Sequence, residues 1–398
     1  MELLQCRDAY WKFLGQCTQC GHCKHACSSL TSADMTLGDI ASGMLHAEAE
    51  SEDASDLMFN ILGNEALTQA VRGCFFCTSC KNTCFAHNDV CDLIYHARID
   101  FQALGLIPRE AWSSVLVDQQ WDIFTSYRAI HGIYYLDLTR HVEREGYPTE
   151  TDCEIAFFPG CSLAAYGEGL TREVFETIEK LGGKTTMLDH CCGSPLKSAG
   201  FFDRAEALCD RIADEVRVSG AKTVVCVCPG CANAMKSTLA RRGMQVDVVS
   251  LPKFLIDHGF TPKKEIPGNL CISKSCQDRT GSYLDELISV LGIDADTPAI
   301  FKGCCGAGGA VSAFQPERQA AQADSKLSFA PDGSTVVTMC PTCTYTYASR
   351  LMEDPRPIEN RHYTELLFEN EFDWDLNFAQ LNTMWSGEYG PWLAQVFA

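Results

Sequence analysis

The fold is decided by a set of five cysteines in the segments Glu154-Ile-Ala-Phe-Phe-Pro-Gly-Cys161, His190-Cys-Cys-Gly193 and Cys228-Pro-Gly-Cys231. The set occurs a second time as Cys276, Cys304-Cys-Gly306 and Cys340-Pro-Thr-Cys343. The second copy is offset by 115 residues at the lone cysteine, 113 at the Cys-Cys-Gly triplet and 112 at the closing pair. Such nearly constant offsets indicate an internal duplication. Ten thiols in two matched sets predict a metal framework.

Short apolar runs precede these cysteines, and helical patterns separate the runs. The predicted strands are 154–158, 185–188 and 223–227 in the first copy, and 270–273, 299–301 and 335–338 in the second. Alternation of strands with helices predicts a parallel α/β sheet in each copy. Since sites in such sheets lie beyond the carboxyl ends of the strands, we expect the five cysteines of each copy to converge there.

Two further cysteine runs lie upstream and share one spacing, C-x2-C-x2-C-x3-C. They consist of Cys17, Cys20, Cys23 and Cys27, and of Cys74, Cys77, Cys80 and Cys84. The spacing resembles that of two-cluster bacterial ferredoxins, in which the fourth cysteine of each run binds the other [4Fe-4S] cube. The resemblance implies one cube on Cys17, Cys20, Cys23 and Cys84, and another on Cys74, Cys77, Cys80 and Cys27. Ser28 and Phe85 replace the proline that usually follows the fourth cysteine. Zinc is the alternative, but two identical four-cysteine runs fit it poorly.

The 46 residues between the two runs have helical rather than hairpin character. Apolar residues such as Ile40, Met44, Leu57 and Ile61 recur at helical spacing. The region therefore resembles the α-helical ferredoxin domain of succinate dehydrogenase iron–sulfur subunits and of the small heterodisulfide reductase subunit.

The duplicated part, roughly residues 153–370, resembles the cysteine-rich CCG domain of the heterodisulfide reductase catalytic subunit. In that family a complete five-cysteine set holds a noncubane [4Fe-4S] cluster, and each cluster takes one sulfur of a split disulfide. The resemblance implies that ten cysteines are both metal ligands and catalytic groups: Cys161, Cys191, Cys192, Cys228, Cys231, Cys276, Cys304, Cys305, Cys340 and Cys343. Neighbouring side chains such as Cys191 and Cys192 point apart on extended backbone, which disfavours two independent corners of one cube.

Composition limits the class of protein. The chain has 398 residues, 24 cysteines and a formal net charge of -20. We expect no nucleic-acid partner for so acidic a chain, because phosphate binding depends on Lys and Arg. We expect no membrane span and no signal peptide, so the expected location is the cytoplasm, with a membrane partner as the means of any attachment to the cytoplasmic face.

Other polar and thiol side chains have less specific roles. Six cysteines outside the motifs are expected to pack in the core: Cys6, Cys91, Cys153, Cys209, Cys226 and Cys271. Cys271 competes with Cys276 as the lone ligand of the second copy, and we favour Cys276 because Cys271 falls on a predicted strand. His22 and His25 are expected to shield the first run. His190 and Lys302 could donate a proton to a departing thiolate, although an indirect role is favoured.

The expected fold class is α+β and multi-domain, with an N-terminal all-α ferredoxin-type domain before two duplicated α/β modules. The predicted divisions are a ferredoxin domain at 1–91, a helical aromatic linker at 92–150, CCG domains at 151–262 and 263–370, and a tail at 371–398. The aromatic residues of the linker either pack on the neighbouring domains or form a docking surface for an electron-donating partner, and the sequence does not decide between the two. Those of the tail are expected to lie across the second module.

The combined pattern predicts an oxidoreductase subunit that passes electrons through two cubane clusters to two noncubane clusters, where a small-molecule disulfide is reduced. The expected partner is an electron-donating redox subunit: a flavoprotein, a hydrogenase or a cytochrome. The alternative is a non-catalytic electron-transfer subunit, like those of flavin-dependent glycerol-3-phosphate, glycolate or lactate dehydrogenases. A zinc-stabilised scaffold is a third class, and it would be colourless.

Overall fold

The computed structural model describes residues 2–88, 90–109, 112–146, 148–294, 296 and 298–386. The chain divides into two units. The first contains Met1–Leu116 together with Pro195–Ala205 and Gly306–Gln322, and the second contains the remainder. The last twelve residues of the predicted tail, 387–398, lie outside the described residues.

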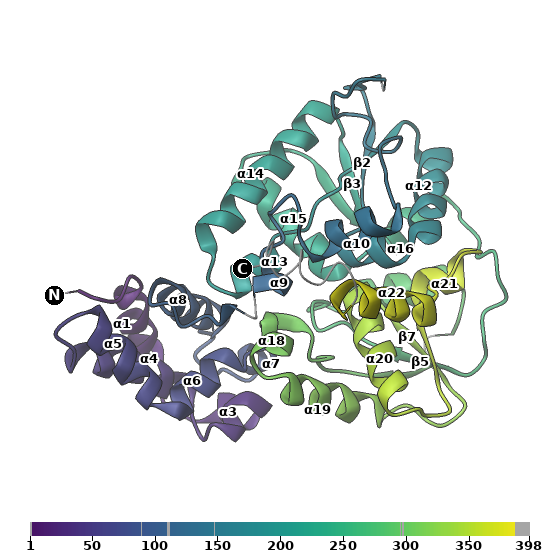
Figure 1. Cartoon of the computed structure of the whole chain (residues 1–398). Helices are drawn as coiled ribbons and strands as arrows, with labels where there is room; N and C mark the ends of the chain where they lie inside the picture. Colours follow the sequence, from purple (N-terminus) through teal and green to yellow (C-terminus); the bar gives the residue numbers. More distant parts are fainter. Residues whose placement is uncertain are drawn as a thin grey trace. The chain divides into compact units, whose positions relative to one another are not determined.

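Helices joined by loops make up the described part of the first unit. Its N-terminal stretch forms α1 (Arg7–Gln16), α2 (His22–His25), α3 (Ser28–Ser32), α4 (Leu37–Ala49), α5 (Ala54–Gly63), α6 (Glu65–Arg72), α7 (Ser79–Asn82), α8 (Val90–Ala103) and α9 (Trp112–Val115). The predicted helical insert between the two cysteine runs is thus confirmed as α3 to α6. The helices appear in purple and blue in Figure 1.

Helix α4 shows why these segments form helices. Thr36 and Asp39 make a capping box at its start, which contributes about 1 kcal/mol. The side chains of Ile40 and Met44 are fully buried, and each such burial contributes roughly 1.5–3 kcal/mol. Packing therefore outweighs capping in holding this helix.

Two segments from the duplicated region complete the first unit, and each continues directly from a Cys-Cys-Gly triplet. The segment after the first triplet contains α13 (Ser194–Ser198) from its second residue onward. The one after the second triplet contains η2 (Gly308–Ala310), α18 (Val311–Phe314) and the start of α19 (Pro316–Leu327). The backbone at Gly308 and Gly309 packs on the carbonyl oxygens of Phe75 and Cys74, where any Cβ would overlap them.

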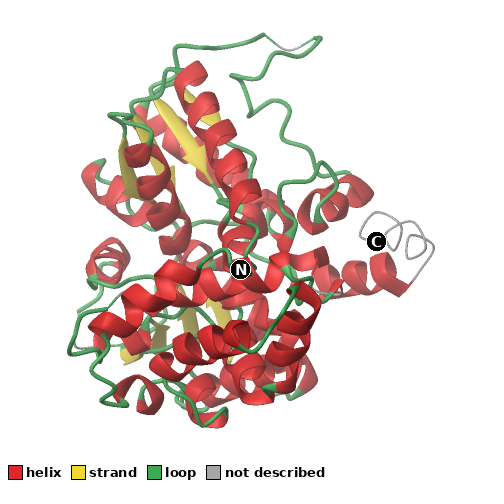
Figure 2. Ribbon diagram, turned by 90° about the vertical axis from the view of Figure 1, so that its left-hand side faces the viewer, coloured by secondary structure: helices red, strands yellow, loops and turns green. Residues whose placement is uncertain are grey.

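The second unit contains two four-stranded parallel sheets. The first has the order β2-β1-β3-β4 and the second β6-β5-β7-β8. The strands are β1 (Ile155–Phe158), β2 (Thr185–Met187), β3 (Thr223–Cys226), β4 (Asp247–Ser250), β5 (Leu270–Ser273), β6 (Ala299–Phe301), β7 (Thr335–Thr338) and β8 (Glu359–His362). Figure 2 shows the strands as two separate groups, in yellow.

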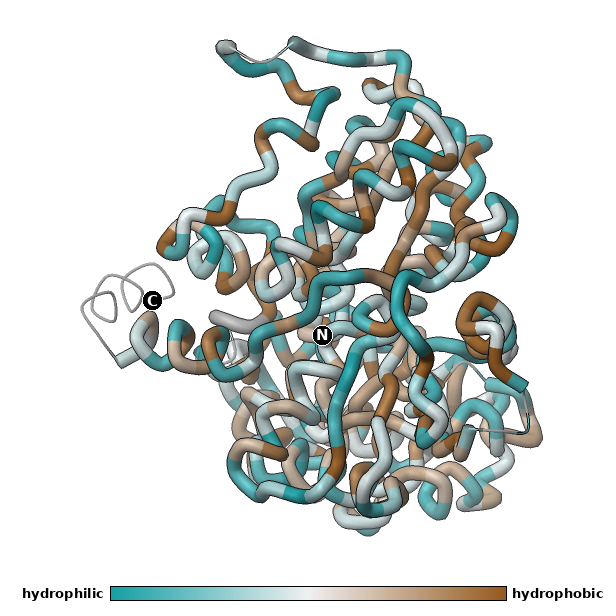
Figure 3. Tube along the Cα trace, turned by 90° about the vertical axis from the view of Figure 1, so that its right-hand side faces the viewer, coloured by the Kyte–Doolittle hydropathy of each residue, from teal (hydrophilic) through white to brown (hydrophobic). Residues whose placement is uncertain are grey.

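Helices cover the strands of each sheet. In the first module they are α11 (Cys161–Tyr166), α12 (Glu168–Gly182), α14 (Phe202–Ser219), α15 (Pro229–Arg241) and α16 (Leu251–Asp257). In the second they are α17 (Ser282–Leu291), α20 (Pro341–Glu353) and α21 (Tyr363–Leu367), while α10 (Ile123–His131) and α22 (Trp374–Ser386) flank the modules in sequence. Figure 1 shows α12 and α14 on either side of the first sheet. Brown and teal alternate along the helices in Figure 3, as amphipathic helices require.

The six predicted strands are confirmed to within one residue at each end. A fourth strand in each module, β4 and β8, was not predicted. Both lie at a sheet edge, and β8 reads Glu-Asn-Arg-His, with no apolar run to mark it. Parallel order and duplication are therefore confirmed.

Part of the predicted linker, from Val117 onward, belongs to the second unit. The hydroxyl of Tyr127 donates to the Asn377 side chain at 2.9 Å, and that of Tyr135 donates to the Ala164 carbonyl at 2.8 Å. The predicted division at 91/92 lies inside α8, so the helix continues across it. The domain divisions themselves stay predictions.

The close packing of the second cysteine run gives a stability prediction. Gly309→Ala should destabilise the protein by several kcal/mol more than Gly105→Ala, because a Cβ at 309 overlaps the Cys74 carbonyl whereas one at 105 meets nothing. The two glycines have matching φ values of +68° and +69°, so the conformational cost of alanine is shared. Denaturant unfolding followed by circular dichroism measures the difference. Equal losses in the two variants would contradict the packing argument.

Candidate functional site

The ten cysteines of the two copies form one continuous series of thiol contacts within the second unit. In the first module Cys191 contacts Cys161 and Cys192, and Cys231 contacts Cys192 and Cys228. In the second, Cys304 contacts Cys276 and Cys305, and Cys343 contacts Cys305 and Cys340. The Cys305 and Cys343 sulfurs lie 3.1 Å apart. The predicted convergence at the strand ends is therefore observed in both modules.

The two sets also meet each other. Cys228 contacts Cys340, which is its own equivalent in the second copy. The full series runs Cys161, Cys191, Cys192, Cys231, Cys228, Cys340, Cys343, Cys305, Cys304 and Cys276. Equivalent cysteines of the two copies therefore follow in the same order from either end. Two further contacts between the modules support this symmetry. Ser162 Oγ, next to the lone cysteine of the first copy, lies 3.1 Å from Thr342 Oγ1 in the closing pair of the second. The equivalent positions of the opposite copies are Gln277 and Gly230, and a Cβ at Gly230 would lie 3.4 Å from Cγ of Gln277. Contact of an element with its own copy is the mark of a two-fold arrangement, so the modules pair about an approximate two-fold axis.

Strand order explains why the thiols gather. In each sheet the strands are added toward one edge and then toward the other, and this order reverses between the two central strands, β1 and β3 or β5 and β7; parallel sheets form their sites at this point. Cys228 and Cys340 follow β3 and β7 and act as N-cap residues of α15 and α20. The positive ends of these helix dipoles stabilise thiolates.

Gly160 allows the lone cysteine to approach the closing pair. Its φ is +80°, and a Cβ there would lie 3.2 Å from Sγ of Cys231. A larger residue would strain the turn and press on that sulfur, so Cys161 reaches the set because glycine precedes it.

The cysteines of the series differ in how readily their thiols lose a proton. Neighbouring S–H groups donate to Cys192, Cys305 and Cys340 and lower the pKa of each, to about 6 for Cys305. A contact with Cys161, with burial, raises the pKa of Cys191. Buried thiolates side by side repel one another, so the full set ionises only with a cation among the sulfurs.

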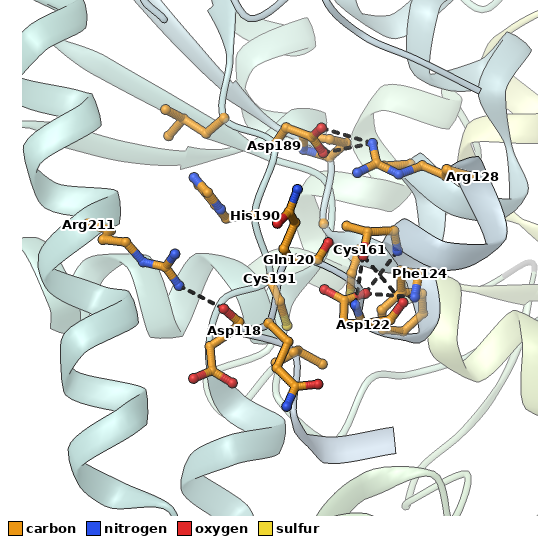
Figure 4. A pocket seen from close by; sticks show the side chains of 17 residues that line it. Asp118, Gln120, Asp122, Phe124, Arg128, Cys161, Asp189, His190, Cys191 and Arg211 are labelled. Atoms are coloured by element: carbon orange, nitrogen blue, oxygen red, sulfur yellow. Dashed lines mark hydrogen bonds and ion pairs between the residues drawn. The ribbon is translucent and has the colours of Figure 1, made fainter. Parts of the chain in front are cut away.

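A cavity of about 310 Å³ opens beside the first set (Figure 4). Cys161 and Cys191 form part of its lining. Arg128 donates to both oxygens of Asp189 at 2.8 and 2.9 Å, and Arg211 donates to the Asp118 carbonyl at 3.2 Å. The cavity therefore presents charged groups of both signs around two thiols, and sequence reasoning missed it because its wall comes from the linker segment at 117–128.

His190 belongs to a row of polar side chains that leads from the partly exposed His190 and Glu215 to the buried His141 and Thr186. Its Nε2 lies 2.6 Å from Glu215, whose other oxygen lies 3.1 Å from Nε2 of His141. His141 Nδ1 in turn lies 2.8 Å from the Thr186 hydroxyl. The row fixes the ring of His190 at the cavity wall, which supports the indirect role expected of it. Lys302 directly follows β6.

In the first unit, four cysteines surround a small cavity: Cys17, Cys20, Cys23 and Cys84. The Leu37 amide N–H donates to Cys23 Sγ at 3.5 Å. Cys20 is exposed, and hydrogen bonds from the amide and side chain of His22 lower its pKa to about 7. We call these four cysteines the outer set. His25 ends the same short helix, α2.

The remaining four cysteines of the runs form the inner set: Cys27, Cys74, Cys77 and Cys80. Burial raises the pKa of Cys27 and of Cys80, and for both thiols the charges of other members of this set contribute. Burial likewise raises the pKa of Cys74 to about 12. The structure thus brings together both cross-run groups that the ferredoxin resemblance implies. The charge of Cys91, in α8, contributes to the raised pKa of Cys74 and of Cys80. Cys91 therefore lies near the inner set, although we expected it only to pack in the core.

Four of the six cysteines expected to pack in the core are buried, whereas Cys6 and Cys91 are partly exposed, so the expectation was wrong for these two. Cys153, Cys209, Cys226 and Cys271 are buried. Cys271 lies within β5, whereas Cys276 contacts Cys304, so geometry supports Cys276 as the fifth thiol of its set.

The donor sets fit iron–sulfur clusters better than single ions. Across the described residues, no three or more His, Cys, Asp or Glu side chains are arranged to hold one metal ion. Five thiols in a set exceed the four ligands of a structural zinc. All-sulfur donors suit the soft metals of iron–sulfur chemistry.

Comparisons with known proteins agree with this chemistry. The cysteine-rich domain family named CCG matches residues 155–236 and 270–347, one match for each module. In the described part of the chain no helix is long and apolar enough to cross a membrane.

Curated relatives are similar over most of the chain. One of them belongs to the dihydromethanophenazine:CoB–CoM heterodisulfide reductase of Methanosarcina acetivorans, and it is 23% identical over 83% of this chain and 87% of its own length. Its counterpart in the enzyme of the same name from Methanosarcina barkeri is 26% identical over 70% of this chain and 72% of its own length. A third relative belongs to the fumarate reductase (CoM/CoB) of Methanothermobacter marburgensis and is 26% identical over 48% of this chain and 40% of its own length.

The row of His190, Glu215 and His141 gives a pH prediction. Burial alone would raise the pKa of Glu215, but hydrogen bonds from the two histidines lower it from 4.5 to about 2. The folded-state value lies below the unfolded value, so the stabilisation is complete above pH 4.5 and is lost as the pH falls toward 2. Glu215→Gln should therefore lower the free energy of unfolding by on the order of 2 kcal/mol near neutrality, and by progressively less below pH 4.5.

Anaerobic urea unfolding between pH 7 and pH 3.5 measures this dependence. Asp214→Asn removes an exposed carboxylate from the same helix and serves as the control. A deficit in Glu215→Gln that stays constant across this range would contradict the assignment.

Proposed function

Since this chain is a heterodisulfide reductase-like iron–sulfur protein with two CCG domains, we propose that it passes electrons from a redox partner to a site where a small-molecule disulfide is reduced to two thiols. The outer and inner sets would each hold a [4Fe-4S] cube. The two five-cysteine sets would each hold a noncubane [4Fe-4S] cluster. When bound, such clusters supply one-electron redox chemistry.

The symmetric series of thiols is the observation that carries this proposal. Disulfide reduction takes up two electrons and two protons, breaks one S–S bond and yields two thiols. Two equivalent one-electron centres placed side by side match that requirement. The contact of Cys228 with Cys340 supports two sets that act together.

The cavity beside Cys161 and Cys191 supports substrate access on the side of the first module (Figure 4). A volume of about 310 Å³ suits a small organic group. Arg128, held by Asp189, and His190, held by Glu215, line its wall and would orient the polar part of the substrate.

The electron donor would be a separate protein subunit. The exposed Cys20 makes the outer set the accessible end of the helical unit. A flavoprotein, a hydrogenase or a cytochrome would supply the electrons there, in the cytoplasm or at the cytoplasmic face of a membrane.

Two matched variants test the proposal. Cys192→Ala and Cys305→Ala each remove one thiol from one set and occupy equivalent positions in the two copies. Both should lower viologen-driven disulfide reduction by orders of magnitude, because groups that act as a unit are strongly non-additive. Cys209→Ala, which removes a buried thiol outside the sets, should retain activity.

An asymmetric result would contradict the proposal. If one of the two variants kept near-normal disulfide reduction while the other was inactive, only one module would be needed. The chain would then be better described as an electron-transfer subunit of a flavin-dependent dehydrogenase.

A further inference from the structure

The inner cysteine set has a buried cation beside it. Arg98 of α8 is 1% exposed, and its guanidinium donates to backbone carbonyls on every side. The acceptors are Val71 at 3.0 Å, Arg72 at 2.9 Å, Cys74 at 3.1 Å, Ser198 at 2.7 Å and Gly309. Phe76 and Phe314 pack on its faces with ring centres 5.0 and 5.2 Å away.

Five neutral carbonyls satisfy the hydrogen bonds of Arg98 but not its charge. In the described part of the chain no carboxylate pairs with it. Burial lowers its pKa to about 10, so it stays protonated at neutral pH. A buried charge without a counter-charge costs several kcal/mol. With a cluster bound, the thiolates of the inner set would supply that counter-charge, and the carbonyl of one of its members, Cys74, already accepts from Arg98.

A second arginine approaches the same set from α19. Gln315, Arg318 and Gln322 lie on one face of this helix segment. Gln315 donates to the Gln69 carbonyl in α6 at 3.3 Å, and Gln322 lies 3.3 Å from the hydroxyl of Ser28, which follows Cys27.

Arg318 therefore lies on the face that packs against the inner set. Its charge acts on Cys27 and Cys74, its Nε is buried without a hydrogen-bond partner, and burial lowers its pKa. An unpartnered buried donor of this kind suits a ligand that is not a protein side chain.

The outer set differs in its surroundings. Cys20 is exposed, and the polar contacts of its sulfur come from His22 and Thr18. Water can solvate added negative charge at the exposed Cys20 of the outer set, whereas the cysteines of the inner set are all only partly exposed, so that set depends more on fixed charges. Without cations, burial would make reduction of the inner cluster unfavourable, because the reduced state carries more negative charge.

We propose that Arg98 and Arg318 raise the reduction potential of the cluster held by Cys27, Cys74, Cys77 and Cys80, and so draw electrons inward from the outer set. The inference rests on the proposed function. One electron leaves the outer cluster and one arrives at the inner cluster, with no bond made or broken and no proton moved. Arg318 belongs to the segment that continues from the second Cys-Cys-Gly triplet, so the CCG region itself supplies a positioning residue for the helical unit.

The variant Arg318→Gln removes the positive charge of Arg318 and leaves the hydrogen bonds of Arg98 in place, so it tests the effect of that charge on the inner cluster. Mediated redox titration with EPR detection, on the anaerobically purified full chain, gives the midpoint potential of each cluster. Cys20→Ser assigns the outer signal. At the wild-type midpoint, Arg318→Gln should lower the reduced-to-oxidised ratio of the inner cluster at least tenfold, which corresponds to a shift of about 59 mV for one electron. The outer midpoint should stay unchanged.

Three further variants complete the test. Arg318→Lys keeps the charge and should keep the inner midpoint. Arg217→Gln removes an exposed arginine of the second unit and should move neither midpoint. Arg98→Lys keeps a charge but loses the planar fork, so the inner midpoint should hold while the melting temperature falls.

An inner midpoint that moves no more in Arg318→Gln than in Arg217→Gln would overturn the inference, and so would the absence of a second cluster signal in the helical unit. These measurements need no disulfide turnover. Loss of disulfide reduction with a normal arginine response would therefore count against the proposed function alone.

Discussion

Ten thiols in mutual contact are the constraint on which the structure depends. Buried sulfur anions repel each other strongly at low dielectric, and hydrogen bonds between S–H groups relieve only part of that repulsion. The chain meets the constraint with two helix N-termini, at Cys228 and Cys340, and with donor sets suited to multi-iron clusters. The clusters would then hold the modules together as much as the modules hold the clusters.

Duplication of one module builds the whole ten-cysteine site. One α/β unit with its cysteines at the switch point of the sheet makes half a site, and pairing it with a copy makes a site with two equivalent halves. The segments that follow the two triplets then join the helical unit, where Gly308 and Gly309 fit against the second cysteine run and Arg98 binds the carbonyls of both segments. The same short loops therefore belong to the cysteine motifs by sequence and to the helical unit by packing.

The sequence predicts the cores of the modules well, because their central strands are buried, apolar and bounded by cysteine motifs. It fails at β4 and β8, whose edge positions leave them half polar and without a hydrophobic run. The grouping of Cys84 with the first run and Cys27 with the second follows from a spacing, and the structure brings the same groups together. The cavity, the row from His190 to His141 and the burial of Arg98 could not be predicted, since each depends on contacts between residues far apart in the chain.

The iron content of the chain distinguishes four bound clusters from two. Two cubane and two noncubane clusters require about sixteen iron atoms per chain, with an equivalent amount of acid-labile sulfide for the cubes. Anaerobically purified protein should approach that iron content, and its ten CCG cysteines should resist alkylation until it is unfolded. About eight irons, with the ten cysteines alkylated in the folded protein, would contradict the account.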